Sequence, residues 1–262
     1  MHEKTVVSLR NNENTMPFLS VEATDMARRY LAFDIETAKD VPGEEFIWRP
    51  HRPLGISCAA TLASDSDQPQ LWYGKSSDGS PAKQMSVQET TELVRYLARM
   101  AAEGYTILTW NGLGFDFDVL AEESRSKPDC MSIALDHVDM MFHLVCSLGY
   151  PVSLQKAADG MGVPGKPQGM TGIRAPKAWA EGQHQVVLDY VSQDVRIALQ
   201  IGQACDQQRE FHWITQRGAR KSVPLANGWL IVREAMKLPE PDTSWMSKPL
   251  SRREFSGWLS GI

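Results

Sequence analysis

Two carboxylates, Asp34 and Glu36, stand one residue apart near the end of the apolar run Tyr30–Thr37. Side chains at positions i and i+2 of a β-strand point to the same face, so these two carboxylates would lie side by side. Two negative charges held this close repel each other unless a positive charge lies between them. The pair is therefore either a solvated strand end or half of a metal-binding site, and the rest of the chain must distinguish the two.

A second polar group follows another apolar run, YTILTWNG, at residues 105–112. Asn111 stands at the end of that run, and Phe115 and Asp116 precede the helical pattern FDVLAEES. Asp116 is either the cap of this helix or a carboxylate of a catalytic site. Asp118 is expected to be solvated, because at the start of a helix it would turn away from Asp116.

A third group lies in the segment LDYVSQDVRIAL, at residues 188–199. Tyr190 and Asp194 are four residues apart and share one face of a helix. An adjacent stripe is apolar and is expected to face the core: Leu188, Val191, Val195 and Leu199. A single Tyr/Asp pair at this spacing is typical of a local hydrogen bond, so the pair gains weight only beside the other two groups.

The composition indicates a globular protein without a membrane span. The chain has 262 residues, of which 42% are hydrophobic and 23% are charged. No apolar run approaches the roughly 20 residues that a transmembrane helix needs, and the first residues lack the apolar core of a signal peptide. The four cysteines are scattered, which favours a reducing cytoplasm over a disulfide framework or a zinc site. With a net charge of −5, nucleic acid would have to be bound by local basic patches.

The elements that would position these groups alternate between strand and helix patterns. Strands are expected at residues 30–37, 55–64, 68–74 and 105–112. A capping box, Ser86 with Glu89, predicts a helix that ends at Gly104, and further helices are expected at residues 117–124, 131–148, 153–160 and 185–205. This order predicts an α/β fold with a mixed sheet covered by helices.

The C-terminal segment, residues 211–262, differs from the rest in charge and in aromatic content. It carries a net charge of +4 against −9 for the remainder, and it holds four of the eight tryptophans. The segment SVPLANGWLIV predicts a hairpin that turns at Asn227-Gly228. Packing against the body is the favoured role of the tryptophans, whereas Arg217, Arg220 and Lys221 remain candidates for binding a single strand.

In chain order, the three polar groups resemble the motifs of the DEDD superfamily of 3′–5′ exonucleases, which have a ribonuclease H-like fold: Asp34-x-Glu36, Asn111 with Phe115-Asp116, and Tyr190-x-x-x-Asp194. The tyrosine is typical of one branch, because the other branch has histidine where this chain has Asp189. FDIET and NGLGFD resemble the proofreading exonuclease domain of family B DNA polymerases more than ribonuclease D. The resemblance implies a stand-alone exonuclease domain at residues 28–210, between a flexible arm at 1–27 and a small C-terminal extension.

The resemblance implies two Mg²⁺ or Mn²⁺ ions held by four carboxylates, namely Asp34, Glu36, Asp116 and Asp194. In this scheme Asp34 bridges both ions, Glu36 and Asp194 hold the ion that activates water, and Asp116 supports the second ion. Tyr190 completes the catalytic set by positioning the attacking water, because a phenol with a pKa near 10 is a poor base at neutral pH. Cations beside Asp34 and Glu36 would explain why two carboxylates share one strand face.

The same resemblance places the 3′ end of a nucleic acid against the site. Asn111 would hold the terminal nucleotide or the loop that bears Asp116. Ile35, Thr37 and Phe115 would flank the terminal sugar and base. Lys166, in the loop GVPGKPQGMTGIRAP, is a candidate phosphate contact, although a solvated loop residue is the default interpretation. Asp136 and Asp139 are interpreted either as further carboxylates near the site or as helix caps.

The sequence thus predicts a metal-dependent 3′–5′ exonuclease that removes nucleotides from single-stranded DNA. Three alternatives stay open: an exoribonuclease, a catalytically silent nucleic-acid-binding subunit, and a subunit that is active only with a protein partner bound through the C-terminal extension. The complete set of carboxylates with Tyr190 argues against the silent subunit, because loss of activity commonly removes a ligand.

Overall fold

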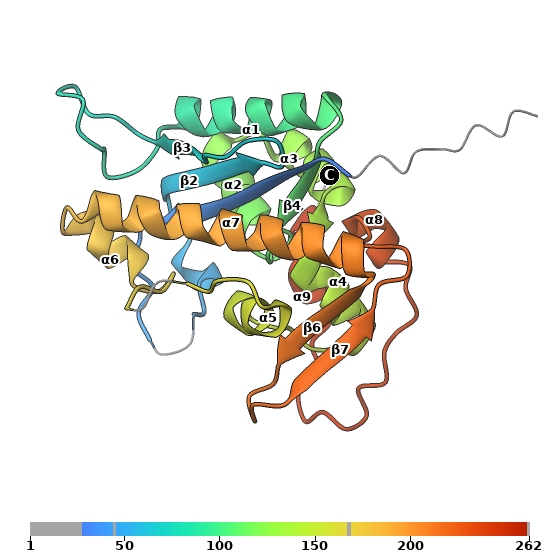
Figure 1. Cartoon of the computed structure of the whole chain (residues 1–262). Coiled ribbons are helices and arrows are strands. Elements are labelled where there is room, and N and C mark those ends of the chain that lie inside the picture. The colour runs from blue at the N-terminus through green and yellow to red at the C-terminus, as the bar shows by residue number, and fades with distance from the viewer. Residues whose placement is uncertain (1–27, 44–45, 167–168, 261–262) are drawn as a thin grey trace, which may run out of the picture.

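The computed structural model describes residues 28–43, 46–166 and 169–260. Within these residues the chain forms a sheet with helices on both faces and a C-terminal hairpin beside them (Figure 1). The flexible arm expected at residues 1–27 lies outside the described residues. None of the helices in the described part of the chain is long and apolar enough to cross a membrane.

Five strands form one mixed sheet in the order β3-β2-β1-β4-β5. The central strand β1 (Tyr30–Thr37) pairs antiparallel with β2 (Ile56–Ala63) and parallel with β4 (Thr106–Thr109). The outer strands are β3 (Gln70–Tyr73) and β5 (Val138–Asp139). The mixed sheet flanked by helices is the α/β fold that the sequence predicts, and the predicted limits of β1 are those observed.

One face of the sheet is covered by helices that pack on alternate residues of β1, among them Leu31, Phe33 and Ile35. These helices are α1 (Val87–Ala102), α2 (Asp116–Ser124) and α3 (Lys127–Asp136), while α4 (Met140–Leu148) follows β5 and contributes residues to the cores on both faces. Figure 1 shows α1, α2 and α3 together on this side of the sheet. The predicted capping box is present at the start of α1, where Ser86 and Glu89 bond each other's backbone N–H groups.

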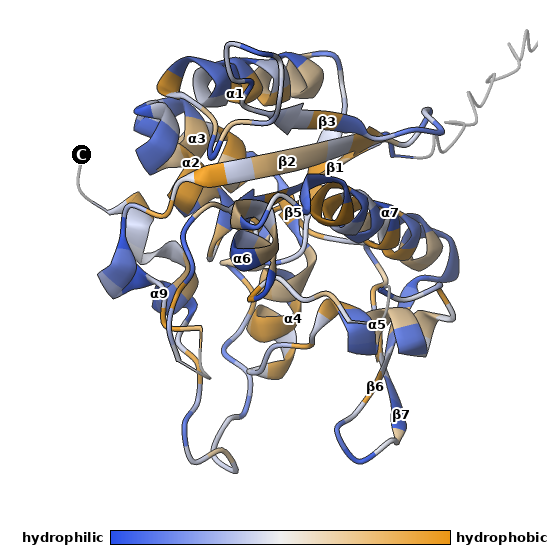
Figure 2. Ribbon diagram, turned by 90° about the vertical axis from the view of Figure 1, so that its left-hand side faces the viewer, coloured by the Kyte–Doolittle hydropathy of each residue, from blue (hydrophilic) through white to orange (hydrophobic). Residues whose placement is uncertain are grey.

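The opposite face carries Tyr30 and Ala32 of β1 and is covered by the long helix α7 (His184–Gln208), which lies across β1, β2 and β4. Two shorter helices, α5 (Leu154–Met161) and α6 (Ala175–Ala180), pack beside α7. Figure 2 shows that α7 is amphipathic, with apolar and polar residues on different sides of the helix. The predicted apolar stripe of α7 is buried, so its polar pair Tyr190/Asp194 is carried to the sheet on a neighbouring stripe.

The C-terminal segment packs on the body through buried aromatic residues. It follows α7 and contains the hairpin of β6 (Glu210–Ile214) and β7 (Arg220–Pro224). Two short helices, α8 (Val232–Ala235) and α9 (Arg252–Ser256), and a 3₁₀ turn, η2 (Gly257–Leu259), come after the hairpin. The other 3₁₀ turn of the described chain, η1 (Arg49–His51), lies between β1 and β2. Trp213 and Trp229 are buried and Trp258 is partly buried, whereas Trp245 is 67% exposed. The packing role expected for the tryptophans thus holds for three of the four.

Two predicted elements are wrong in ways that have a physical reason. The hairpin forms between β6 and β7, with its turn at residues 215–219, and not at Asn227-Gly228. The strand EFHWI follows α7 directly and pairs with RKSVP, which leaves Asn227-Gly228 to form a separate turn after β7. The apolar run 131–148 is not one helix, because β5 interrupts it and pairs with β4.

The end of α5 also differs from the prediction. The helix continues through Gly160 and is closed by Gly162, which adopts a left-handed conformation with φ of 70°. Gly160 has a different role, because a Cβ there would overlap the Trp213 backbone and the His212 carbonyl. Glycine at this position therefore permits the close approach of α5 to β6.

Candidate active site

The carboxylates of β1 lie on the face that α7 covers. Asp34 and Glu36 alternate with the buried apolar residues of the opposite face, as the strand period requires. Their partners on β2 are Ala60 and Cys58, two small residues. Small neighbours leave room above this end of β1, and Glu36 is buried there with 5% of its surface exposed.

Helix α7 brings a third carboxylate to this pair. One carboxylate oxygen each from Asp34, Glu36 and Asp194 can be chosen so that all three lie within 4.8 Å of one another. Tyr190, one turn earlier on α7, is buried and lines the same pocket. The structure therefore brings together residues that are 160 positions apart in the sequence, from the centre of the sheet and from the helix that crosses it.

Asp116, the first residue of α2, lines the same pocket but lies outside this close cluster. Its Oδ1 accepts a hydrogen bond of 3.1 Å from the backbone N–H of Ile35, between the two carboxylates of β1. The side chain is 2% exposed and does not cap its own helix. This bond fixes the start of α2 against the end of β1, at the edge of the sheet where β1 and the parallel strand β4 both end.

The loop between β4 and α2 is shaped by the buried carboxylate of Asp139. Its oxygens accept the backbone N–H groups of Asn111, Leu113 and Phe142 at 3.0, 2.8 and 3.0 Å. Asn111 has a positive φ of 76°, so this bond holds a backbone conformation that few residues adopt. Asp139 is therefore the cap of α4 and the support of the Asp116 loop, which decides between the two interpretations left open for it.

Asp118 is not the solvated residue that the sequence predicts. Its side chain is buried, with 3% exposed, and its carboxylate pairs with Arg52 at 2.9 Å. Arg52 also bonds Glu122 one turn later on α2. The side chain of Asp118 turns away from Asp116 as expected, but the guanidinium of Arg52, from the loop after β1, pairs with its carboxylate.

Lys166 contacts the catalytic candidates directly. Its Nζ donates to the Tyr190 hydroxyl at 2.7 Å and to Asp194 Oδ2 at 2.5 Å, and it lies 4.7 Å from the centre of the Tyr190 ring. The loop after α5 that carries Lys166 thus supplies a positive charge to the carboxylates. In the sequence Lys166 is a candidate phosphate contact with a solvated loop residue as the default, and nothing in its spacing indicates the partners that it has.

Burial and mutual repulsion raise the pKa values of all four candidate carboxylates. Burial raises the pKa of Asp34 and of Glu36 well above the usual range, and the neighbouring carboxylates raise both further. Burial raises the pKa of Asp116 to about 7, although the hydrogen bond from the Ile35 N–H acts to lower this pKa. The pKa of Asp194 is also raised by burial, while Lys166 opposes the shift. Such a cluster is unfavourable when ionised unless cations compensate it.

The oxygen atoms of the cluster fit a divalent cation. Oδ1 of Asp194 is buried and has no hydrogen-bond partner among the described residues, although buried polar atoms are almost always paired. Carboxylate oxygens are the hard donors that Mg²⁺ and Mn²⁺ prefer. An unpaired buried oxygen beside two further carboxylates is the arrangement expected of ligands for such an ion.

The cluster opens into a pocket of about 420 Å³ with an aromatic wall. Five of the residues predicted to contact nucleic acid line it: Ile35, Thr37, Asn111, Phe115 and Lys166. Phe46 and Trp48 pack edge-on against Phe115, with ring centres 5.5 and 5.2 Å apart. The other three predicted contacts, Arg217, Arg220 and Lys221, belong to the β6–β7 hairpin and its turn and do not line this pocket.

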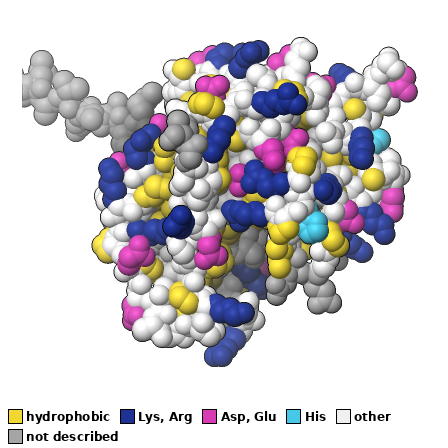
Figure 3. Space-filling view, turned by 180° about the vertical axis from the view of Figure 1, so that it is seen from behind, with side chains coloured by type: hydrophobic (Ala, Val, Ile, Leu, Met, Phe, Trp, Pro, Cys, Tyr) yellow, Lys and Arg dark blue, Asp and Glu magenta, His cyan; other side chains and the backbone are white. Residues whose placement is uncertain are grey.

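Several pocket residues were missed by reasoning from the sequence. Phe46, Trp110, Met170 and Ile173 line the pocket, and Phe46 and Ile173 are 37% and 44% exposed. Exposed apolar residues in loops were the available signal, but a loop sequence does not indicate which way the loop folds. Over the rear face of the molecule, basic and acidic side chains are interspersed (Figure 3), so the charge pattern of that face singles out no site.

Comparison with protein-family models finds a match to a model of the RNase H superfamily over residues 72–203. The match spans half of the chain and includes Asp116, Tyr190 and Asp194, and the chain therefore belongs to the RNase H superfamily. It begins after β1, the strand that carries Asp34 and Glu36. A search of curated proteins found no match.

Two solved structures to which this chain is similar are a family B DNA polymerase and an exonuclease, according to their names. The family B DNA polymerase of the hyperthermophilic archaeon Pyrobaculum calidifontis is similar at 17% identity and a TM-score of 0.46, over 69% of this chain and 24% of that one. Exonuclease I is similar at 14% identity and a TM-score of 0.32, over 69% of this chain and 42% of that one. The chain thus spans less than half the length of either protein.

Proposed function

We propose that this protein is a metal-dependent 3′–5′ exonuclease that hydrolyses single-stranded DNA and releases nucleoside 5′-monophosphates. The observation that carries the proposal is the convergence of Asp34, Glu36 and Asp194 within 4.8 Å, in a pocket that Asp116 and Tyr190 also line. Membership of the RNase H superfamily supports it, because the matched residues 72–203 include Asp116, Tyr190 and Asp194.

The four carboxylates would hold two Mg²⁺ or Mn²⁺ ions, whose chemistry is to activate water and to neutralise the charge that develops on the phosphodiester. Asp34, Glu36 and Asp194 form the compact part of this ligand set. Asp116 completes it from the start of α2, where its Oδ1 also bonds the Ile35 N–H. The buried Oδ1 of Asp194, which has no hydrogen-bond partner among the described residues, would gain one in a cation.

Tyr190 would orient the attacking water through its hydroxyl. Burial raises the pKa of this phenol, and the carboxylates of Asp194, Glu36 and Asp34 raise it further, so the group stays protonated at neutral pH. A protonated phenol can donate or accept one hydrogen bond, but it does not remove a proton from water. The role of Tyr190 is therefore positioning and not proton transfer.

The aromatic wall would receive the terminal nucleotide. Phe115 is held edge-on by Phe46 and Trp48, which fixes a flat apolar surface within reach of a base. Ile35 and Thr37 line the pocket on the β1 side, and Asn111 lines it at the end of β4. Lys166 is the one described ammonium among the lining residues and is the proposed phosphate contact.

The test is a gel assay with 5′-labelled single-stranded DNA and RNA of one sequence, in Mg²⁺, Mn²⁺ or EDTA. A shortening ladder that requires metal and is lost in Asp34→Ala is expected, and faster shortening of DNA than of RNA supports the proposed substrate. Faster shortening of RNA would replace DNA by RNA as the substrate. Binding of either strand without any cleavage would replace the enzyme by a binding subunit.

The proposed location is the cytoplasm. The four cysteines are buried and none forms a disulfide, as is usual for proteins of a reducing compartment. Fractionation of cells followed by detection of the endogenous protein tests this location, and recovery with the membrane or outside the cell would contradict it.

A further inference from the structure

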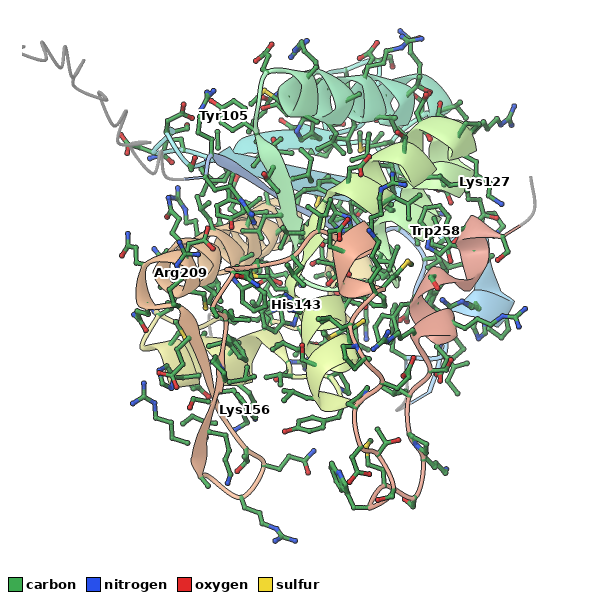
Figure 4. All side chains as sticks on the ribbon, turned by 90° about the vertical axis from the view of Figure 1, so that its right-hand side faces the viewer. Tyr105, Lys127, His143, Lys156, Arg209 and Trp258 are labelled. Atoms are coloured by element: carbon green, nitrogen blue, oxygen red, sulfur yellow. The ribbon has the colours of Figure 1, made fainter. Side chains whose placement is uncertain are left out.

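A second pocket lies beside the β6–β7 hairpin and takes no part in the proposed chemistry. It has a volume of about 840 Å³ and is bounded by the hairpin, the start of α5 and the chain segment that carries Trp245. Figure 4 shows Lys156 on α5 beside this hairpin. We call it the hairpin groove and define it by six of its lining residues: Tyr150, Lys156, Trp213, Arg217, Lys221 and Trp245.

The hairpin groove has an aromatic surface that the fold leaves open. The rings of Tyr150 and Trp245 meet edge-on with centres 5.9 Å apart, and those of Tyr150 and Trp213 lie 6.5 Å apart. Trp213 is anchored in the core with 5% exposed, whereas Trp245 is 67% exposed. An indole held in place by its neighbours but exposed on one side is suited to stacking on a planar ligand.

The charge of the hairpin groove has one sign. Lys156, Arg217 and Lys221 line it, and among the described residues that line it none is Asp or Glu. Lys221 pairs with Trp213 across the hairpin, so an aromatic ring and a cation share this face. Arg220 pairs with Ile214 at the next position along the strand; Ile214 lines the groove, whereas Arg220 does not.

The hairpin groove and the carboxylate pocket are separated by a single stretch of chain. Leu154 lines the carboxylate pocket, whereas its neighbours Val152 and Ser153 line the hairpin groove. Trp110, a residue of the carboxylate pocket, donates its indole N–H to the Val152 carbonyl at 3.1 Å. A chain that leaves one pocket can therefore enter the other across the start of α5.

We propose that the hairpin groove binds the part of a nucleic-acid single strand that lies on the 5′ side of the nucleotide in the carboxylate pocket. The inference rests on the proposed function, because it takes the carboxylate pocket as the position of the 3′ end. Aromatic rings with basic side chains and no acidic ones match the two chemical features of a single strand, its stacked bases and its phosphates. The groove gives the enzyme affinity for long strands without contact with the reacting phosphate.

The test compares strand lengths by fluorescence anisotropy in EDTA, where no hydrolysis occurs. Single-stranded DNA of about 4 and about 16 nucleotides is bound to the wild type, to Trp245→Ala/Lys221→Ala and to the control Arg220→Ala. The double variant is expected to bind the long strand at least about tenfold more weakly and the short strand as the wild type does. Its salt dependence for the long strand should be shallower by about 0.7 in log–log slope, for one lost phosphate contact.

The control has the same hairpin and the same net charge as the double variant, so an equal loss of long-strand affinity in Arg220→Ala would overturn the proposal in favour of general charge attraction. Unchanged affinity in the double variant would also overturn it and would point to a peptide or another protein as the occupant. Hydrolysis of thymidine 5′-(4-nitrophenyl phosphate) reports the carboxylate pocket alone and should be equal in all three proteins. No hydrolysis by any of them would refute the proposed enzyme, while the anisotropy comparison would still decide the groove.

Discussion

At the scale of single residues, the carboxylate pocket holds more negative charge than the one described cation lining it can offset. Lys166 bonds Asp194 and Tyr190, yet the pKa values of Asp34, Glu36 and Asp194 are all raised. A protein without bound metal therefore carries repulsion at this point that a bound divalent cation would relieve. Single substitutions can measure how much each residue contributes to the repulsion and how much to cleavage.

Replacing Asp34 by asparagine should abolish cleavage and leave the fold intact. The substitution removes one charge from the cluster, so the free energy of unfolding of the metal-free protein should rise by about 1–3 kcal/mol. Gel assays of single-strand cleavage and urea unfolding in EDTA measure the two effects. The control is Asp189→Ala, an exposed carboxylate of the same helix α7 as Asp194, which should change neither quantity. Wild-type cleavage by Asp34→Asn would refute the assignment of the site.

Replacing Tyr190 by phenylalanine should slow cleavage by about 10- to 100-fold. The variant keeps the ring and loses the hydroxyl, and one hydrogen bond to a charged group contributes about 1.5–3 kcal/mol. Metal affinity, measured by calorimetry, should stay within about threefold, because the four carboxylates are unchanged. A variant that cleaves at the wild-type rate would show that the hydroxyl does not position the water.

The stability of the metal-free protein should depend on pH through Asp116. Its pKa is about 7 in the folded protein against 3.8 for an ordinary aspartate, so between these values the folded state keeps a proton that the unfolded state has lost. This contribution is complete below about pH 4 and is lost as the pH rises to 7. His137 acts in the opposite sense, because burial lowers its pKa to about 4.

A difference measurement separates Asp116 from His137. Asp116→Asn keeps an oxygen that can accept the Ile35 N–H but carries no charge at any pH. In EDTA its free energy of unfolding should equal that of the wild type near pH 4 and exceed it by about 2–4 kcal/mol at pH 8. Urea unfolding at several pH values gives the difference, and a constant difference across this range would contradict the raised pKa.

The types and spacing of residues were sufficient to predict which of these side chains share a strand or helix face, whereas their joint assignment to one site came from the family resemblance. Alternation along β1 and the four-residue spacing on α7 place Asp34 with Glu36 and Tyr190 with Asp194, because both periods are local properties of the backbone. The contact of Lys166 with Asp194 could not be predicted, since it depends on the path of a loop without a repeating pattern. The prediction that Asp118 is solvated is wrong for a similar reason, because its partner Arg52 comes from another loop.

At the scale of elements, the packing of α5 on β6 depends on one glycine. A Cβ at position 160 would overlap the backbone of Trp213, so Gly160→Ala should lower the free energy of unfolding by about 1–3 kcal/mol or more. Gly257→Ala is the matched control, because a Cβ there would lie 3.9 Å from its nearest neighbour, Cγ of Arg253, and the φ of Gly257 is −60°. Urea unfolding of the two variants measures the difference, and equal stabilities would show that α5 can move away from the hairpin at no cost.

Long, periodic elements were predictable from the sequence and short ones were not. The capping box of α1 and the apolar stripe of α7 act within one helix, so sequence alone reveals them. Strand β5 has only two residues, and its apolar flanks continue as helices, so no period distinguishes it from them. Asn227-Gly228 is a strong turn signal and predicts a hairpin there, although the strands that pair lie on either side of residues 215–219.

At the scale of the whole molecule, the C-terminal segment is part of the core. Trp229 is fully buried, and its ring meets those of Phe211 and His143 with centres 5.6 and 5.4 Å apart. Trp229→Ala should therefore lower the free energy of unfolding by about 3–5 kcal/mol. The exposed Trp245→Ala is its matched control and should stay within about 0.5 kcal/mol of the wild type. Equal effects in urea unfolding would mean that the segment is only loosely attached.

The arrangement of the whole molecule was predictable as a class and not in detail. Alternating strand and helix patterns predict a sheet between helices, but no local pattern states that β1 is central or that α7 crosses it. A basic, tryptophan-rich tail was evident from composition. Its division into buried anchors and one exposed indole depends on packing between segments that are far apart in the sequence. For the same reason, removing the residues after 211 to test for a protein partner would take away part of the core as well.

The stretch Val152–Leu154 has a consequence for how this protein can change over generations. Because Leu154 lines the carboxylate pocket and the adjoining Val152 and Ser153 line the hairpin groove, a substitution that shifts the backbone of this stretch alters both pockets at once. Substitutions at these three positions would then change turnover and strand affinity together, whereas substitutions elsewhere would change the two properties independently. Variants selected in the laboratory for faster turnover alone should avoid this stretch, whereas variants selected for both properties together should concentrate their changes there.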